Sequence, residues 1–398
     1  MVHASTVDNM NTNQTNASTA RVATQPSGPI FSLADYEKAS RHMMDEGVWH
    51  YIHGGAGDGI TLARNRSAFD DIRLMPRVLA AGLPDMRCSL LGSTLAAPIL
   101  LAPLALQRLV HRDGELASVA AAMAQDCGFV LSTLTSSPMA TVAQSAVSAR
   151  KGAASSKMGA ASATSKGAST PLWFQLYIQP DWQDTLSLIR RAEDLGFGAL
   201  VITVDAPITG LRLAELRAGF SVPELIQPVE LAGMKPAPTS LEDVLAAAPG
   251  WQSIEAVCAA TRLPVLLKGV LSPEDALKAK ALGIAGVIVS NHGGRVLDGV
   301  PGTIECQAAV RAAVGPEMTV LLDGGIRRGS DIAKALCLGA DAVLIGRPLM
   351  QALACEGALG VARMLKILKD ELAMVMALLG AKRLKDLNRH CLWKQSCP

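Results

Sequence analysis

The segment GVIVSNHGGRVLD at residues 286–298 places a base, His292, and a cation, Arg295, directly after an apolar run. The run is rich in β-branched residues, which is typical of a central strand, and the paired glycines let the backbone turn sharply beside a ligand. An isolated histidine at the end of a strand most often only forms a hydrogen bond with a neighbouring group. Because Ser290 and Arg295 flank it, we interpret His292 as an acid–base residue at the carboxyl end of a strand.

Two later apolar runs end in turns that suit a phosphate group. The sequences LLDGGIRRGSD at 321–331 and VLIGRP at 343–348 combine glycines, a helix start and the cations Arg327 and Arg347. Exposed backbone N–H groups and guanidinium groups both favour a phosphate monoester. Ordinary turn glycines are the alternative, and no GxGxxG fingerprint of a dinucleotide site follows an early strand. We therefore predict a site for one phosphate group.

Two charged residues at the ends of other apolar runs suit the same chemistry. Asp205 can hold the tautomer of His292 and stabilise its imidazolium form. Lys268 can offset negative charge that develops on a cofactor ring. Each could equally be an ordinary ion-pair partner.

The remaining candidates are guanidinium and phenol groups. Arg212 would join Arg295 at the same strand ends, and two guanidinium groups there favour a substrate carboxylate. For Arg212 alone, a solvated surface position is an equal alternative. Tyr177 lies at a strand end, and Tyr51 lies in the sequence HYIHGGAGD, which we interpret as a tight turn. Either tyrosine could simply be a packed aromatic residue.

Eight continuous apolar runs alternate with helical patterns that open on Asp or Ser and close on Gly. Continuous runs are typical of strands covered on both faces, and eight of them predict an α/β fold, a (β/α)8 TIM barrel with an N-terminal helical extension. A doubly wound open sheet is the alternative. The eight expected strands are 98–105, 129–134, 172–178, 199–206, 264–270, 286–291, 319–325 and 342–348.

Three segments depart from this alternation of strands and helices. Residues 1–30 are rich in Asn, Thr, Ser and Ala, and we expect a disordered tail. Residues 148–170 are rich in Ala, Ser, Gly and Lys, and we expect a flexible insertion. Residues 221–250, after the fourth strand, form the longest gap between strands, where a barrel would place a lid.

Length and charge limit the possible partners. Of 398 residues, 49% are hydrophobic, which suits one large barrel domain expected over residues 31–392. The 37 Lys and Arg nearly balance 35 Asp and Glu, so no nucleic acid or anionic membrane is expected, and no run approaches a membrane span. The eight cysteines lie scattered without CxxC spacing, so we expect reduced thiols, no metal site and a cytoplasmic protein.

Seven motifs, collinear from about residue 31 to 392, resemble the FMN-dependent 2-hydroxy acid oxidase and dehydrogenase family, which includes glycolate oxidase, lactate oxidase and mandelate dehydrogenase. They are LAPLALQRLVH, FQLY, ITVDAPITGLR, LLKGV, SNHGGRVLDG, LLDGGIRRGSD and LIGRP. The resemblance implies FMN as cofactor, a 2-hydroxy carboxylic acid as substrate and a homotetramer. It implies His292, Asp205, Tyr177 and Arg295 as catalytic residues.

The resemblance also assigns the binding residues. Substrate contacts would come from Tyr51, Tyr177, Arg212, His292, Arg295 and Leu134. Cofactor contacts would come from Pro103, Leu104, Ala105, Ser132, Gln175, Thr203, Lys268, Ser290, Asp323, Gly324, Gly325, Ile326, Arg327, Gly346 and Arg347.

Two departures from glycolate oxidase bear on the substrate. Leu134 stands where that enzyme has a tryptophan, and Ile52 stands where it has a second tyrosine. An apolar wall at these positions favours an aryl or larger aliphatic 2-hydroxy acid, as in lactate and hydroxymandelate oxidases. Ala105, where several dehydrogenases have glycine, favours oxygen as electron acceptor over a quinone. The rivals are a lactate or mandelate dehydrogenase, another phosphate-binding barrel, and a flavin-binding regulatory protein.

Overall fold

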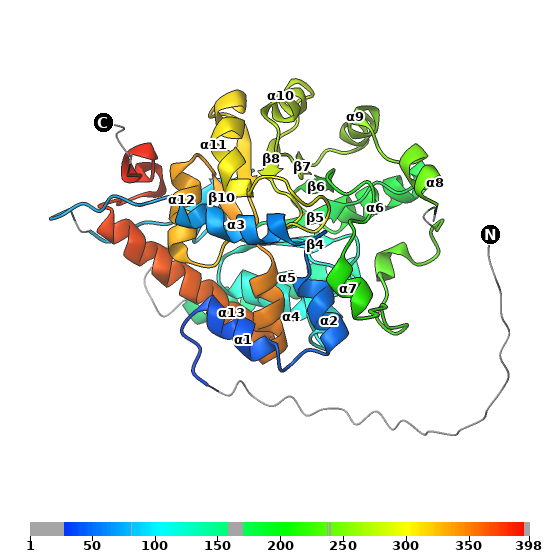
Figure 1. Ribbon diagram of the computed structural model, residues 1–398, viewed down its shortest axis with the longest axis horizontal. Coiled ribbons are helices and arrows are strands. Elements are labelled where there is room, and N and C mark those ends of the chain that lie inside the picture. Colours follow the sequence, from blue (N-terminus) through cyan, green and yellow to red (C-terminus); the bar gives the residue numbers. More distant parts are fainter. Residues whose placement is uncertain (1–27, 81, 158–169, 237, 239, 394–398) are drawn as a thin grey trace.

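Eight parallel strands close into a barrel at the centre of the computed structural model, which describes residues 28–80, 82–157, 170–236, 238 and 240–393 (Figure 1). Their order around the barrel is β10-β3-β4-β5-β6-β7-β8-β9. Each overlaps one of the eight predicted runs, so the closed barrel is confirmed and the open sheet is excluded. The strands are β3 (Ile99–Leu101), β4 (Gly128–Ser132), β5 (Leu172–Leu176), β6 (Leu200–Thr203), β7 (Val265–Lys268), β8 (Gly286–Val289), β9 (Thr319–Leu322) and β10 (Ala342–Ile345).

Alternate residues of the strands fill the barrel interior with apolar side chains. Trp173 and Leu344 belong to this cluster, and Leu90 and Leu95 join it from a short hairpin that precedes the barrel. The hairpin consists of β1 (Cys88–Leu90) and β2 (Ser93–Leu95), which the sequence patterns did not predict. It lies at the amino end of the strands, since Ala96 N–H donates to the carbonyl of Asp126 just before β4. The packed interior leaves the carboxyl ends for a binding site.

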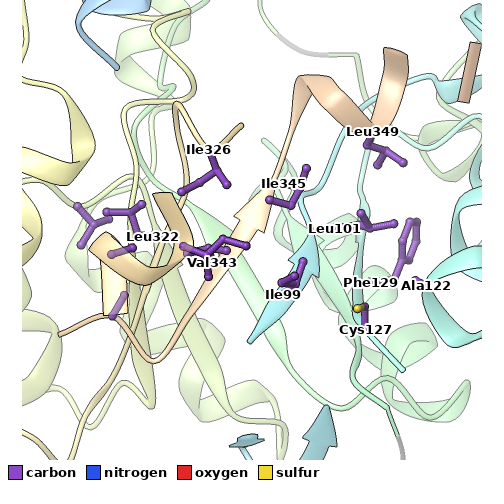
Figure 2. Close-up of a cluster of buried hydrophobic side chains, with 14 of the residues drawn as sticks. Ile99, Leu101, Ala122, Cys127, Phe129, Leu322, Ile326, Val343, Ile345 and Leu349 are labelled. Carbon is purple, nitrogen blue, oxygen red and sulfur yellow. The ribbon is translucent and has the colours of Figure 1, made fainter. Parts of the chain in front are cut away.

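A helix follows each barrel strand and covers the outside of the sheet. In Figure 2, Ile99 and Leu101 of β3 and Val343 and Ile345 of β10 pack toward flanking helices, where Leu349 lies. As predicted, Asp181 and Ser272 cap the helices that follow β5 and β7. The helices are α4 (Gly114–Ala124), α5 (Met139–Lys157), α6 (Trp182–Asp194), α9 (Trp251–Ala260), α10 (Pro273–Ala281), α11 (Thr303–Val314), α12 (Gly329–Cys337) and α13 (Arg347–Leu378), the last broken at Glu356 and Gly357.

The predicted N-terminal helical extension consists of α1 (Leu33–Ser40), α2 (Glu46–His53) and α3 (Ile60–Asp70). The interpretation of Tyr51 as a turn residue was wrong, because α2 continues through it and the chain leaves the helix only at Gly54. Polar and glycine residues after position 53 made the whole segment look like a turn. Its aromatic and aliphatic residues before that point instead pack one face of α2 against Met350.

The prediction of a flexible loop at 148–170 was wrong for residues 148–157, which continue α5. The low apolar content favoured a loop, whereas the alanines of this segment have a high helix propensity. Residues 158–169 lie outside the described part of the chain, as does most of the predicted tail, residues 1–27.

The long connection after β6 contains four short elements. They are α7 (Leu213–Arg217), the 3₁₀ turn η2 (Val229–Leu231), α8 (Leu241–Ala246) and, last, α9. Buried Glu230 anchors the connection, because its carboxylate accepts from Met139 N–H at 2.6 Å and pairs with Arg191. The part before this anchor, residues 204–228, lies over the carboxyl ends of the barrel strands, where it contributes Ile208 and Arg212 to a pocket. That this connection acts as a lid stays a prediction.

Candidate active site

A pocket of about 320 Å³ opens at the carboxyl ends of the barrel strands and collects nearly all the predicted site residues. Asp205 and Ser290 do not line it; they lie behind His292 and Lys268 respectively. The predicted residues that line the pocket are Tyr51, Pro103, Leu104, Ala105, Ser132, Leu134, Gln175, Tyr177, Thr203, Arg212, Lys268, His292, Arg295, Asp323, Gly324, Gly325, Ile326, Arg327, Gly346 and Arg347.

His292 and Asp205 form a bonded pair, with 2.9 Å between Nδ1 of the imidazole and Oδ1 of the carboxylate. The backbone of His292 is left-handed (φ 56°), which turns its side chain from β8 toward the pocket. Burial alone would raise the pKa of Asp205, but the hydrogen bond from His292 and the charge of Lys268 lower it. A carboxylate at Nδ1 favours the tautomer in which Nε2 is free to accept a proton.

Gly269 makes room for this pair at the end of β7. Its φ of 112° suits glycine, and a Cβ there would lie 2.4 Å from both Cβ and Cγ of Asp205. Any side chain at position 269 would therefore displace the carboxylate. The sequence offered no signal for this contact beyond the glycine itself.

Lys268 provides a buried cation on the floor of the pocket. Its Nζ lies 2.9 Å from the Ser290 hydroxyl and 3.1 Å from an Asp323 carboxylate oxygen. Burial alone would lower the pKa of Lys268, but Asp323 and Asp205 raise it, so the ammonium stays charged. Ser290 also accepts from the backbone N–H of His292 at 3.2 Å, so its hydroxyl links the lysine to the histidine loop.

Arg327 and Arg347 are partly buried cations at the glycine-rich end of the pocket, and neither forms an ion pair with a carboxylate in the described residues. Arg347 instead donates to the carbonyls of Ile52 at 3.0 Å and Gly293 at 2.9 Å. Burial, together with the charges of Arg295 and Arg327, lowers the pKa of Arg347 to about 9. Such uncompensated cations call for an anion.

Arg295 and Arg212 bring two more guanidinium groups to the other end. Arg295 donates through Nη1 to the carbonyls of Tyr51 at 2.5 Å and Gly54 at 3.1 Å, and it lies over the Tyr51 ring. Arg212 donates through Nη1 to Glu215 at 2.8 Å. Burial and the charge of Arg212 lower the pKa of Arg295, so the cations also need an anion between them.

The two phenols stay protonated at neutral pH. Burial raises the pKa of Tyr177 to about 12, and burial also raises the pKa of Tyr51. Tyr177 directly follows β5, and the Tyr51 ring stacks on Phe220 with 4.8 Å between ring centres. Each phenol can therefore donate a hydrogen bond to a ligand oxygen.

The end of α2 is held from outside the pocket by a neutral histidine. His53 bonds the carbonyl of Trp49 through Nδ1 at 3.1 Å, and its Nε2 lies 2.9 Å from the side-chain nitrogen of Gln351. Burial, followed by the charges of Arg347 and other arginines, lowers the pKa of His53 to about 4. This arrangement fixes the carbonyls that Arg295 and Arg347 share, and the sequence patterns did not identify it.

FMN suits the donors and acceptors that the pocket leaves open. Gln175 Nε2 and Asp323 Oδ1 are buried without a partner in the described structure, and both residues line the pocket. A Cβ on Gly346 would meet nothing within 4 Å, so backbone and solvent-sized space remain beside Arg347. An isoalloxazine ring with ribityl hydroxyls and a phosphate can satisfy these groups. No cluster of three or more potential metal ligands occurs in the described residues.

Fold and site together are typical of a (β/α)8 enzyme with room for a phosphate-bearing cofactor beside a His–Asp pair and two arginines. The chain belongs to the FMN-dependent dehydrogenase family, whose model matches residues 40–394. Both the predicted family and the predicted cofactor, FMN, are thereby confirmed.

Relatives of the chain are oxidases of 2-hydroxy acids. It is 42% identical over 375 residues to L-lactate oxidase of Alicycliphilus denitrificans, covering 91% of this chain and 96% of that protein. It is 39% identical over 362 residues to 4-hydroxymandelate oxidase of Amycolatopsis orientalis, covering 88% and 95%. A structure of mandelate oxidase with (S)-2-phenylpropionate superposes with a TM-score of 0.79 at 38% identity, covering 92% and 98%. The predicted class, an FMN-dependent 2-hydroxy acid oxidase, is confirmed.

Proposed function

We propose that this protein oxidises an (S)-2-hydroxy acid with an apolar side chain to the 2-oxo acid, and that oxygen is reduced to hydrogen peroxide. The observation that carries the proposal is the pocket itself. His292, which is bonded to Asp205, lines one cavity together with four arginines, and this grouping supports the proposal.

The substrate carboxylate lies between Arg212 and Arg295 in this proposal, where their guanidinium groups fix the Cα–H bond toward the cofactor. The hydroxyl lies near Nε2 of His292, which accepts its proton while Asp205 stabilises the imidazolium. Tyr177 donates to a substrate oxygen. When bound, FMN would supply the acceptor for the two electrons and for the hydrogen that leave Cα.

The remaining pocket residues hold the cofactor in this proposal. Lys268 offsets negative charge on the ring, and the guanidinium groups of Arg327 and Arg347 take the phosphate. Backbone and polar groups from the strand ends bind the ring and the ribityl chain. These groups belong to Pro103, Leu104, Ala105, Ser132, Gln175, Thr203, Asp323, Gly324, Gly325, Ile326 and Gly346, while Ser290 acts through Lys268.

Apolar residues around the pocket support a side chain larger than the hydrogen of glycolate. Leu134 and Ile52 line it, as expected, and Ile208 and Met350 add apolar surface that the sequence patterns did not indicate. The names of the relatives, lactate and hydroxymandelate oxidases, agree with aliphatic and aryl side chains. Oxygen as acceptor is supported by the same names and by Ala105, which lines the pocket.

A panel of glycolate, lactate, longer 2-hydroxyalkanoates and mandelate tests the proposal, with kcat/KM and peroxide measured on purified yellow protein. We expect released FMN, peroxide formation and lowest activity on glycolate. Best activity on glycolate would contradict the apolar-pocket argument, and equal activity on an uncharged alcohol would contradict the arginine clamp. Anaerobic flavin reduction without peroxide in air would favour a dehydrogenase.

We also propose a homo-oligomer, a tetramer by family resemblance, in the cytoplasm. The segment before β1 carries the exposed apolar residues Val78, Leu79 and Leu83, and α13 carries exposed Met374 and Leu378. This segment runs beside the end of α13, where Arg77 N–H donates to the carbonyl of Leu378 (Figure 1). Such a patch is typical of a protein interface. Light scattering of the purified protein measures the oligomeric state. No described helix is long and apolar enough to cross a membrane.

A further inference from the structure

The two arginines proposed to hold the substrate carboxylate are themselves held in different ways. Arg295 is held by uncharged backbone carbonyls at the end of α2. Arg212 is held by a carboxylate, Glu215, one turn further along at the start of α7, with 2.8 Å between Nη1 and Oε2. Both partners of this ion pair are mostly shielded from solvent, with side-chain exposures of 19% and 21%.

The ion pair occupies one end of the Arg212 guanidinium and leaves another edge open. Glu215 takes Nη1, whereas Nε is buried without a hydrogen-bond partner in the described structure. The Nε–H and one Nη2–H point in parallel along the side of a guanidinium, and this spacing matches the two oxygens of a carboxylate. Arg212 lines the pocket, and the ion pair with Glu215 restricts the rotation of its guanidinium group there.

Glu215 acts on the pocket through its charge and not through contact, because it does not line the cavity. Its negative charge raises the pKa of Arg295 and that of Tyr51, in each case as a smaller effect than burial. It therefore compensates one of the two guanidinium charges at the substrate end. The other cations have partners of their own: Lys268 pairs with Asp323, and the arginines at the glycine-rich end face the phosphate site.

From this charge balance we propose that Glu215 is a positioning and specificity residue that restricts the site to monocarboxylic 2-hydroxy acids. Two guanidinium charges, one Glu215 carboxylate and one substrate carboxylate sum to zero. A second carboxylate on the substrate side chain meets no remaining positive charge and is repelled by Glu215. The inference rests on the proposed function, because it assumes that Arg212 and Arg295 bind the substrate carboxylate.

Glu215→Gln tests the charge while keeping the length and an acceptor oxygen for Arg212. The matched control is Glu224→Gln, an exposed carboxylate in the same connection. We expect the ratio of kcat/KM for malate to kcat/KM for lactate to rise roughly tenfold in Glu215→Gln, as suits removal of one partly screened charge. The ratio stays unchanged in the control. A merely structural role would lower both values together and leave the ratio at its starting level.

Binding measurements separate this inference from the proposed function. Pyruvate and oxaloacetate are the 2-oxo acids that correspond to lactate and malate, and the change in flavin absorbance on their binding reports their affinities without turnover. The ratio of these two affinities can therefore be measured even on holoenzyme that oxidises neither lactate nor malate. If none of lactate, the longer 2-hydroxyalkanoates and mandelate reduces the wild-type flavin, the proposed function fails; if one of them does and both ratios stay constant in FMN-loaded Glu215→Gln, this inference alone fails. Should that variant lose FMN, Glu215→Asp keeps the charge on a shorter arm, and we expect a raised KM for lactate with malate still rejected. Malate accepted by Glu215→Asp as well as lactate overturns the inference.

Discussion

Asp205→Asn should slow flavin reduction by roughly 10- to 1000-fold while leaving FMN bound. The carboxylate lies 2.9 Å from Nδ1 of His292, and an amide keeps an acceptor oxygen there but loses the charge. A charge-assisted hydrogen bond contributes up to about 1.5 kcal/mol more than a neutral one, and unit charges about 4 Å apart interact by about 4 kcal/mol at an effective dielectric constant of 20. The imidazolium formed during catalysis therefore loses about 1.5–4 kcal/mol, which corresponds to the stated range.

The assay is anaerobic stopped-flow reduction of the bound flavin by lactate or mandelate, with FMN content measured on the same samples. Asp341→Asn is the matched control, because Asp341 forms a 2.6 Å ion pair with Arg311 at the amino end of β10, away from the pocket. The control should reduce its flavin at the wild-type rate. An Asp205→Asn variant that is equally fast refutes the role assigned to the pair.

Three further variants probe the surroundings of this pair. Gly269→Ala should retain FMN but lose at least about tenfold in flavin reduction, because its Cβ would displace Asp205; a wild-type rate counts against the close contact. Arg295→Lys should lower kcat/KM roughly 10- to 150-fold, because one ammonium cannot serve the α2 carbonyls and a substrate carboxylate together; a change under twofold contradicts the clamp. His53→Gln should flatten the pH dependence of unfolding. Since folding lowers the pKa of His53 from 6.5 to about 4, its contribution is complete above pH 6.5 and is lost as pH falls toward 4, by up to about 3 kcal/mol. Urea unfolding at pH 7 and pH 4.5 gives the free energy of unfolding of the wild type and of His53→Gln. An equal decrease between the two pH values in both proteins excludes His53 as the cause.

The barrel was predictable because each of its strands is covered on both faces. Strands in that environment have continuous apolar sequences, and the polar residues at the carboxyl ends of parallel strands all lie on one side of the barrel. His292, Lys268 and the glycine-rich turns could thus be grouped into one site from the sequence alone, and all of them line the pocket. The hairpin β1–β2 escaped prediction because its strands have three residues each and only one buried residue apiece.

Sequence patterns fail where a role depends on contacts between distant segments. Nothing local distinguishes Glu215 from other helical glutamates, and its role follows from the 2.8 Å contact with Arg212. The family resemblance implied that Ser290 contacts the cofactor, whereas its hydroxyl accepts a hydrogen bond from Lys268 and does not line the pocket. The helical residues 148–157 were missed because composition was given more weight than helix propensity.

The shared use of the α2 carboxyl end has a consequence for redesign of this enzyme. The carbonyls of Ile52 and Gly54 accept hydrogen bonds from both Arg295 and Arg347, so a single backbone turn supports the substrate end and the phosphate end of the pocket. Substitutions that enlarge the pocket at position 52 are therefore expected to change FMN retention together with selectivity. Variants with the desired selectivity would then lose FMN during purification and score as inactive. Position 134, whose backbone carbonyl bonds Leu106 and neither arginine, is the better starting point for altering substrate range.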